Sequence, residues 1–214
     1  MSKRPSPSAS GSSSSSAKRT HIEHNGCLVF GIGLDPERCF LSTLYRRPLQ
    51  IQGRSYISVE HYYQSGKYEH AIHANAETAE YHRLLLACDS NFKAIALGCR
   101  RKHRFSSQWL ISRAQPQLGT VDAAIDRLAA HAQRQPDWHA HNRAAMRRGL
   151  EARFREPKLR AQLAATAPLR LLYVQPSSRY WAHAPGFAVL ADERERGANV
   201  LGELLMELRV EFSQ

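Results

Sequence analysis

Residues 58–67 read Ser-Val-Glu-His-Tyr-Tyr-Gln-Ser-Gly-Lys, and this stretch predicts the helix on which the fold and its chemistry depend. Ser58 belongs to a residue type that caps helices, and Glu60 falls in the first turn, where a negative charge is favourable. On such a helix Glu60, either Tyr63 or Gln64, and Lys67 lie on one face. An acid, an aromatic ring or an amide, and an amine aligned over two turns can line a pocket for a sugar and a flat base. An ordinary solvent-exposed helix face is the alternative interpretation.

Apolar residues with helical spacing predict further helices on both sides of this segment. The pattern i, i+3, i+4, i+7 occurs within 81–88, 121–128 and 201–208. Two more helices are expected, one over 146–154 and one that starts at Pro157. Helices therefore account for most of the predicted structure.

Short apolar runs predict a few strands among these helices. Residues 27–30 and 171–174 are candidate single strands, and 49–57 indicates a small hairpin with Gly53 at its turn. The expected fold is mainly α: a single compact helical domain over 26–214 with a few short β-strands.

Residues 1–25 differ from the rest because they are rich in serine and basic residues and poor in apolar ones. We expect a disordered tail, since such a segment buries too little apolar surface to offset the entropy of ordering. The basic pairs Lys3-Arg4 and Lys18-Arg19 allow a nuclear-import signal or a phosphate-binding arm. An inert solubilising tail is the alternative.

The chain is strongly basic, with 30 Lys and Arg against 19 Asp and Glu and a formal net charge of +11. Such a balance favours anionic ligands that carry phosphate. The alternative is a cationic surface that only aids solubility, which would have the same excess of basic residues. The four cysteines are scattered with no C-x-x-C pair, which argues against a zinc ribbon or a disulfide scaffold. No metal and no cofactor are expected. The histidine pairs His70/His73 and His139/His141 have no cysteine or acid at a spacing that would complete a metal site.

Neither a membrane span nor an export signal is expected, because no apolar run has the necessary length or position. Together with the cysteine pattern, this predicts a soluble cytoplasmic protein. A nuclear location is possible in a eukaryote because of the basic tail.

The segment 58–67 resembles the signature helix of the NADAR (YbiA-like) family, which reads roughly S-x-E-H-x-x-Q-x-x-K. Other blocks resemble the family's in the same order over about residues 27–212: A-I-A-L-G at 94–98, Asp137-Trp138 before Met146, Leu163 to Thr166, Trp181, and G-A-N-V-L-G-E-L-L-M at 197–206. The resemblance implies a NADAR-type domain and an N-glycosidase. Family members cleave the bond between a nitrogen base and ribose phosphate in riboflavin-pathway intermediates, or remove ADP-ribose from modified guanine.

This resemblance implies two catalytic residues, Glu60 and Lys67. Loss of a base from ribose builds positive charge on the sugar ring, which the Glu60 carboxylate can stabilise, or Glu60 can position the water. Lys67 can hold a phosphate, protonate the leaving group, or attack C1 to form an imine. The expected partner is a small phosphorylated ribosyl substrate or an ADP-ribosylated nucleic acid. The predicted substrate-binding residues are Ser42, Tyr63, Gln64, Trp181, Asn199 and Gly202.

Several positions depart from the family pattern. In that pattern the strand that corresponds to 171–174 carries a glutamate, and the motif P-x-D-x-x-W-G-x-G follows it. Tyr173 replaces the glutamate, Ser178 the aspartate, and Ala182 and Ala184 the two glycines. Glu60 is then the main carboxylate of the site, so either the activity is reduced or the substrate differs. The alternative function is a catalytically weakened nucleotide- or ADP-ribose-binding protein on the same fold. A third interpretation, a plain nucleic-acid-binding module, is supported by the net charge alone.

Overall fold

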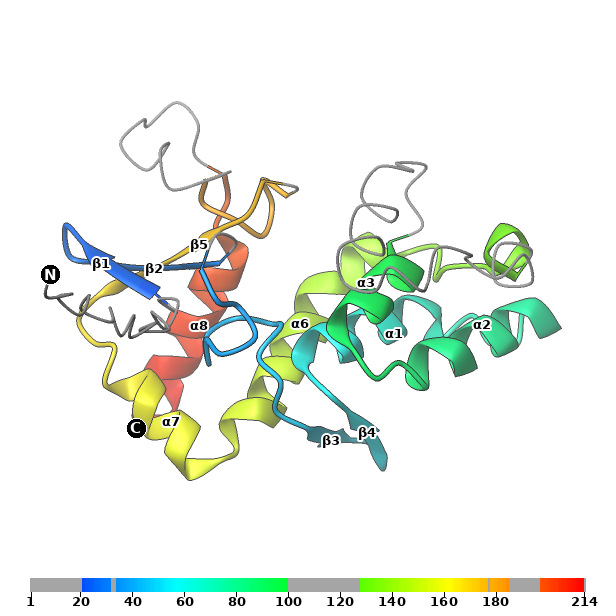
Figure 1. Ribbon diagram of the computed structural model, residues 1–214, viewed down its shortest axis with the longest axis horizontal. Helices are drawn as coiled ribbons and strands as arrows, with labels where there is room; N and C mark the ends of the chain where they lie inside the picture. The colour runs from blue at the N-terminus through cyan, green and yellow to red at the C-terminus, as the bar shows by residue number, and fades with distance from the viewer. Residues whose placement is uncertain (1–20, 32–33, 100–127, 177, 185–196, 214) are drawn as a thin grey trace, which may run out of the picture.

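A computed structural model describes residues 21–31, 34–99, 128–176, 178–184 and 197–213 (Figure 1). Strand β1 (His21–His24) pairs antiparallel with β2 (Cys27–Gly31), and β2 pairs in parallel with β5 (Arg170–Val174). A two-residue turn joins β1 to β2, and both of its residues, Asn25 and Gly26, have positive φ, as this tight hairpin turn requires. Residues 21–24, which the sequence places in the expected tail, therefore belong to the sheet.

Three helices gather on the far side of the molecule from this sheet (Figure 1). They are α1 (Val59–Glu69), α2 (Ala76–Leu86) and α3 (Asn91–Gly98), and α1 contacts both of the others. The predicted hairpin precedes them as β3 (Leu49–Ile51) and β4 (Arg54–Tyr56). Each helix is capped by the side chain of the residue before it, which accepts a hydrogen bond from a backbone N–H of the first turn.

Helix α6 (Trp138–Phe154) lies between these two groups of elements and contacts α1, β3, α7 (Pro157–Ala164) and α8 (Val200–Glu211). Helix α8 packs in turn against β5. The main hydrophobic core runs through all of them and includes Phe30, Leu41, Tyr62, Leu150 and Leu205. The core fixes α1 against α6, and with it the position of the 58–67 segment.

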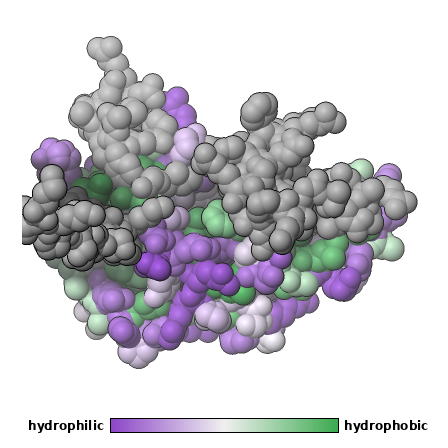
Figure 2. Space-filling model, in the orientation of Figure 1, coloured by the Kyte–Doolittle hydropathy of each residue, from purple (hydrophilic) through white to green (hydrophobic). Residues whose placement is uncertain are grey.

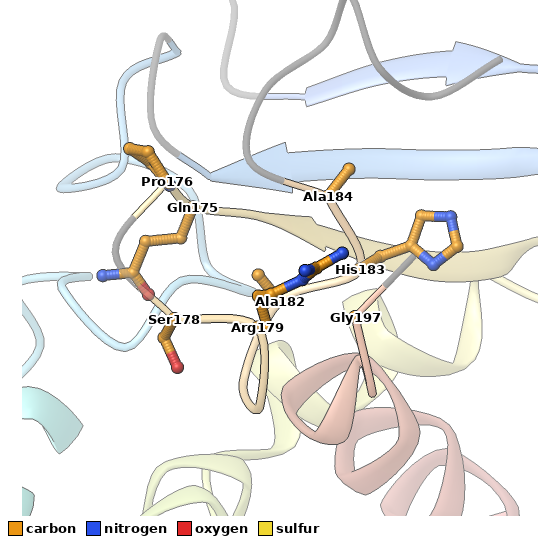
Figure 3. A pocket seen from close by; sticks show the side chains of 8 residues that line it. All are labelled: Gln175, Pro176, Ser178, Arg179, Ala182, His183, Ala184 and Gly197. Atoms are coloured by element: carbon orange, nitrogen blue, oxygen red, sulfur yellow. The ribbon is translucent and has the colours of Figure 1, made fainter. Parts of the chain in front are cut away.

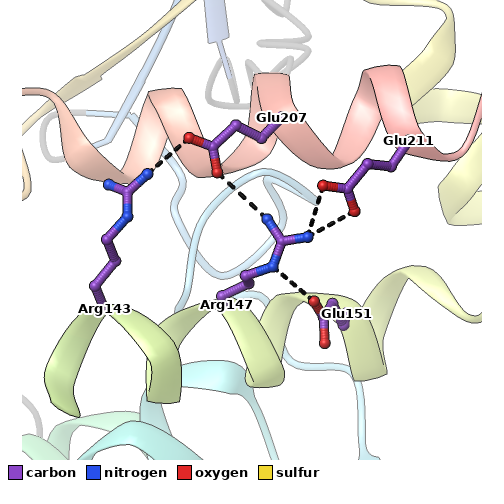
Figure 4. A network of polar contacts seen from close by, with 5 residues as sticks. All are labelled: Arg143, Arg147, Glu151, Glu207 and Glu211. Atoms are coloured by element: carbon purple, nitrogen blue, oxygen red, sulfur yellow. Dashed lines mark hydrogen bonds and ion pairs between the residues drawn. The ribbon is translucent and has the colours of Figure 1, made fainter.

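Helices α6 and α8 are also joined on the outside by an ion-pair network (Figure 4). Arg147 contacts Glu151 on its own helix and Glu207 and Glu211 on α8, while Arg143 pairs with Glu207. The N···O distances are 2.6–3.3 Å, but the side chains are exposed by 30–49%. Exposed pairs contribute little individually, and these join into one network that links the two helices.

The elements agree with the sequence expectations in most places, but the fold is mixed α/β more than mainly α, because the strands form two small sheets. The helix over 121–128 lies outside the described residues except at Leu128, as do residues 1–20 of the tail. The structure adds α3, which the sequence reasoning had not assigned to a helix.

Hydrophilic side chains cover much of the face in Figure 2, and Tyr180 and Val210 are the exposed large hydrophobic side chains of the described residues.

Candidate functional site

Helix α1 begins at a point where two other segments supply hydrogen-bond partners for its first turn. The Ser58 hydroxyl accepts a bond from the His61 backbone N–H at 3.0 Å, and it also contacts Asn91 at the start of α3. The Glu60 backbone N–H donates to the carbonyl oxygen of Thr43 at 3.0 Å. These contacts satisfy amide groups that an isolated helix would leave free, and they fix where Glu60 sits.

The structure brings Glu60, Gln64 and Lys67 together as a hydrogen-bonded row along α1. Gln64 Nε2 donates to Glu60 Oε1 at 2.6 Å, and Lys67 Nζ donates to Gln64 Oε1 at 2.5 Å. The side-chain amide of Gln64 therefore connects Glu60, through its nitrogen, to Lys67, through its oxygen. Because Gln64 and Lys67 are buried while Glu60 is half-buried, the row runs from the surface into the interior.

Thr43 is the second group that binds the Glu60 carboxylate. Its hydroxyl Oγ1 donates to Glu60 Oε2 at 2.8 Å, so each carboxylate oxygen accepts one hydrogen bond from the protein. A carboxylate has about four lone-pair sites, and the remaining ones can still face a substrate or a water. Thr43 follows Ser42 in the segment before β3, and the sequence reasoning had not assigned it to the site.

The inner end of the row lies against the C-terminus of α3. Lys67 Nζ also donates to the carbonyl oxygen of Gly98 at 3.4 Å and lies 5.2 Å from the centre of the Tyr63 ring. Arg134 donates to the same carbonyl at 2.8 Å. A side chain at position 98 would collide with Gln64, so this close approach of α3 to α1 requires glycine. Two cations are thereby placed beside one carbonyl oxygen.

Tyr63 belongs to a cluster of four aromatic rings, together with Trp138, Tyr180 and Trp181. Its ring meets Trp138 at 5.2 Å and Trp181 at 5.6 Å between centroids, both in edge-to-face geometry, and Trp181 meets Tyr180 at 4.9 Å. Burial raises the pKa of Tyr63 to about 12, so its hydroxyl stays protonated at neutral pH. Trp181 is half-buried, which leaves part of its indole for contact with a ligand.

The other predicted substrate-binding residues use their polar groups within the protein. Ser42 is buried, and its hydroxyl accepts a bond from the Leu44 backbone N–H. Asn199 has a left-handed backbone conformation, and its amide bridges the Leu171 carbonyl and the Tyr173 N–H of β5. A side chain at Gly202 would collide with Leu171 and Asn199. Asn199 and Gly202 thus join the start of α8 to β5, and their contact with a substrate stays a prediction.

The segment that follows β5, described at 175–176 and 178–184 and here called the late loop, lines a small pocket on the surface (Figure 3). The pocket is lined by Gln175, Pro176, Ser178, Arg179, Ala182, His183, Ala184 and Gly197. The Ser178 hydroxyl accepts a bond from the Trp181 N–H at 3.2 Å, so it shapes the turn that presents Trp181. Tyr173, by contrast, packs on Phe30 with ring centroids 5.3 Å apart, and burial raises its pKa well above the usual range. Neither position supplies a carboxylate.

No described helix is both long and apolar enough to cross a bilayer. Within the described part of the chain, no three His, Cys, Asp or Glu residues are grouped as metal ligands would be.

Comparison with known proteins identifies the class to which this fold and this row belong. The family model of the NADAR domain matches residues 32–213, and the chain therefore belongs to the NADAR family. Among solved structures, the NMR structure of the E. coli protein YbiA matches with a TM-score of 0.58 and 21% sequence identity, covering 92% of this chain and 91% of that one. At this identity the likeness shows the shared fold. None of the curated proteins matches the chain.

Proposed function

We propose that this protein is an N-glycosidase that hydrolyses the bond between a nitrogen base and a phosphorylated ribose. The substrate would be a ribosylated, phosphate-bearing pyrimidine of the riboflavin pathway or an ADP-ribosylated guanine. The observation that carries the proposal is the row on α1, in which a carboxylate held at both oxygens lies two hydrogen bonds from an ammonium group. Membership of the NADAR family supports it.

Glu60 would act on the sugar. As the base leaves, positive charge develops on C1 and the ring oxygen, and a carboxylate already oriented by Thr43 and Gln64 stabilises that charge without reorganising. The same carboxylate can orient the attacking water. A water molecule then adds to C1 and loses a proton, which leaves ribose with a hydroxyl group at C1.

Lys67 would act at the opposite end of the row. Its ammonium can hold a phosphate or donate a proton to the departing base, and as a neutral amine it could form an imine with the opened ribose. Treatment of the reaction with borohydride separates these roles, because reduction of an imine leaves ribose covalently bound to Lys67. A protein of unchanged mass after turnover and reduction would restrict Lys67 to the first two roles.

The test of the function is release of free base from each substrate class, with Glu60→Gln as the diagnostic variant. We expect the rate to fall by about a hundredfold or more, because the amide cannot stabilise the developing charge. Glu69→Gln is the matched control, since Glu69 lies on the same helix and pairs with Arg54 at the surface. Equal rates for Glu60→Gln and the parent would remove Glu60 from the mechanism.

A second candidate function is binding of a nucleotide or ADP-ribose without hydrolysis. The observation that favours it is the absence of a carboxylate at Tyr173 and Ser178, one of which packs in the core while the other shapes a turn. Calorimetric binding of ADP-ribose by a protein that releases no base from either substrate class would support this function. Turnover would exclude it.

A further inference from the structure

Arg153 is a charged side chain in the interior of the domain. It lies near the C-terminal end of α6 and is only 2% exposed. Burial lowers its pKa to about 9, so the guanidinium still carries its charge at neutral pH. Among the described residues no carboxylate forms a salt bridge with it, and its Nε has no hydrogen-bond partner. Burying such a cation is costly, so its position needs a reason.

The partners of Arg153 are carbonyl oxygens of one short segment. Its NH1 donates to Phe40 O at 3.2 Å and to Ser42 O at 2.6 Å, and its NH2 donates to Thr43 O at 3.2 Å. The guanidinium also lies 5.9 Å from the centre of the Tyr45 ring. One rigid, planar group thus holds the backbone of 40–43 in place.

Thr43 connects this segment to the row on α1 by two contacts. Its carbonyl oxygen, which accepts from Arg153, also accepts from the Glu60 backbone N–H at 3.0 Å. Its hydroxyl donates to Glu60 Oε2 at 2.8 Å. A shift of the Thr43 backbone would therefore move both the start of α1 and the hydrogen bond that orients the carboxylate.

We propose that Arg153 is a positioning residue for Glu60 and that it acts through Thr43. Arg153 fixes the 40–43 backbone, Thr43 then fixes Glu60 Oε2, and Gln64 fixes Oε1, so the plane of the carboxylate is set before a substrate arrives. Reaction rates depend steeply on such orientation. This proposal rests on the proposed N-glycosidase function and assigns the orientation of its carboxylate to Arg153 and Thr43.

The Thr43 hydroxyl is tested by the pair Thr43→Val and Thr43→Ser. Valine has nearly the same shape but no donor, whereas serine keeps the hydroxyl. We expect Thr43→Val to lower kcat by about tenfold with little change in KM, because the lost bond matters where charge develops. Thr43→Ser should retain most of the parent's kcat. Equal kcat in the two variants would overturn the role of Thr43.

The Arg153 contact is tested without any enzymatic readout, by hydrogen exchange at the Glu60 amide. Arg153→Met removes all three hydrogen bonds, and we expect exchange at Glu60 to accelerate relative to the amide of Leu205 in α8. Arg153→Lys keeps the charge and can reach fewer carbonyls, so it should give a smaller change and still reports if Arg153→Met fails to fold. Exchange at Glu60 that matches the parent in Arg153→Met, or in Arg153→Lys if Arg153→Met fails to fold, would overturn the proposal for Arg153.

The two sets of measurements also separate this proposal from the function on which it rests. A parent protein that releases no base from any substrate contradicts the N-glycosidase function. In that case faster exchange at Glu60 in the Arg153 variants still supports the positioning of Glu60 by Arg153.

Discussion

The row on α1 and the late loop around Trp181 are both parts of the NADAR pattern, but they use their polar groups differently. On α1, Glu60, Gln64 and Lys67 are bonded to one another in one row. In the late loop, the Ser178 hydroxyl is bonded to the backbone of its own turn. The polar side chains of the first region bond to one another, and that of Ser178 in the second bonds to its own turn. The family pattern is retained at Glu60, Gln64 and Lys67 and altered at Ser178.

The largest effect is expected from adding a carboxylate to the late loop. Asp at position 178 can accept the Trp181 N–H as serine does, while it returns a negative charge to the loop. We expect Ser178→Asp combined with Ala182→Gly to raise the rate of base release by roughly a hundredfold, and by more than either single change.

Rates of the parent, both single variants and the double variant test this expectation on the two substrate classes. Ala182 is buried, so its replacement also removes packing, and thermal unfolding of each variant should accompany the rates. If the double variant binds ADP-ribose but gains no rate, the missing aspartate does not limit this protein.

A smaller effect is expected from disrupting the α1 row through its neighbour α3. Gly98→Ala places a methyl group against Gln64, which must move away from Glu60 or Lys67. We expect a loss of about 1–3 kcal/mol in the free energy of unfolding and a lower rate of base release. Denaturant unfolding and the base-release assay measure both.

A Gly98→Ala variant as stable and active as the parent would show that the close approach of α3 is not needed.

The smallest effect is a loss of stability in acid that originates in the first turns of α1. Burial lowers the pKa of His61, whose Nδ1 accepts the Ile57 N–H while Nε2 lies 2.7 Å from Leu85 O. The folded protein therefore holds His61 neutral, whereas the unfolded chain binds a proton near pH 6.5. Below that pH the unfolded state takes up more protons, so the free energy of unfolding falls as pH decreases.

His61→Gln tests this origin, because glutamine offers an acceptor and a donor but does not titrate. Melting temperatures between pH 7.5 and pH 5 should fall less steeply in the variant than in the parent. Burial also lowers the pKa of His82, so some acid sensitivity should persist. If the melting temperatures of variant and parent fall equally steeply, a group other than His61 causes the loss of stability in acid.

The sequence alone determined the elements whose signals are local. Ser58 caps α1, Gly53 turns the hairpin, Pro157 begins α7, and leucines at helical spacing form α8, all as predicted. Strand β1 was missed, although Asn25-Gly26 is a strong hairpin signal, because the serine-rich composition before it dominated the interpretation.

The orientation of the row on α1, by contrast, depends on contacts between residues far apart in the sequence. The spacing on one helix places Glu60 and Lys67 on one face with either Tyr63 or Gln64 between them, since helical geometry is fixed by the backbone. The hydrogen bonds of the structure show that Gln64 connects them. The contacts of Thr43 with Glu60 and with Arg153 join residues 17 and 110 positions apart. No periodicity records such contacts, because they depend on how α6 packs against the 40–43 segment. The sequence determined which residues carry the proposed chemistry, and packing decided their orientation.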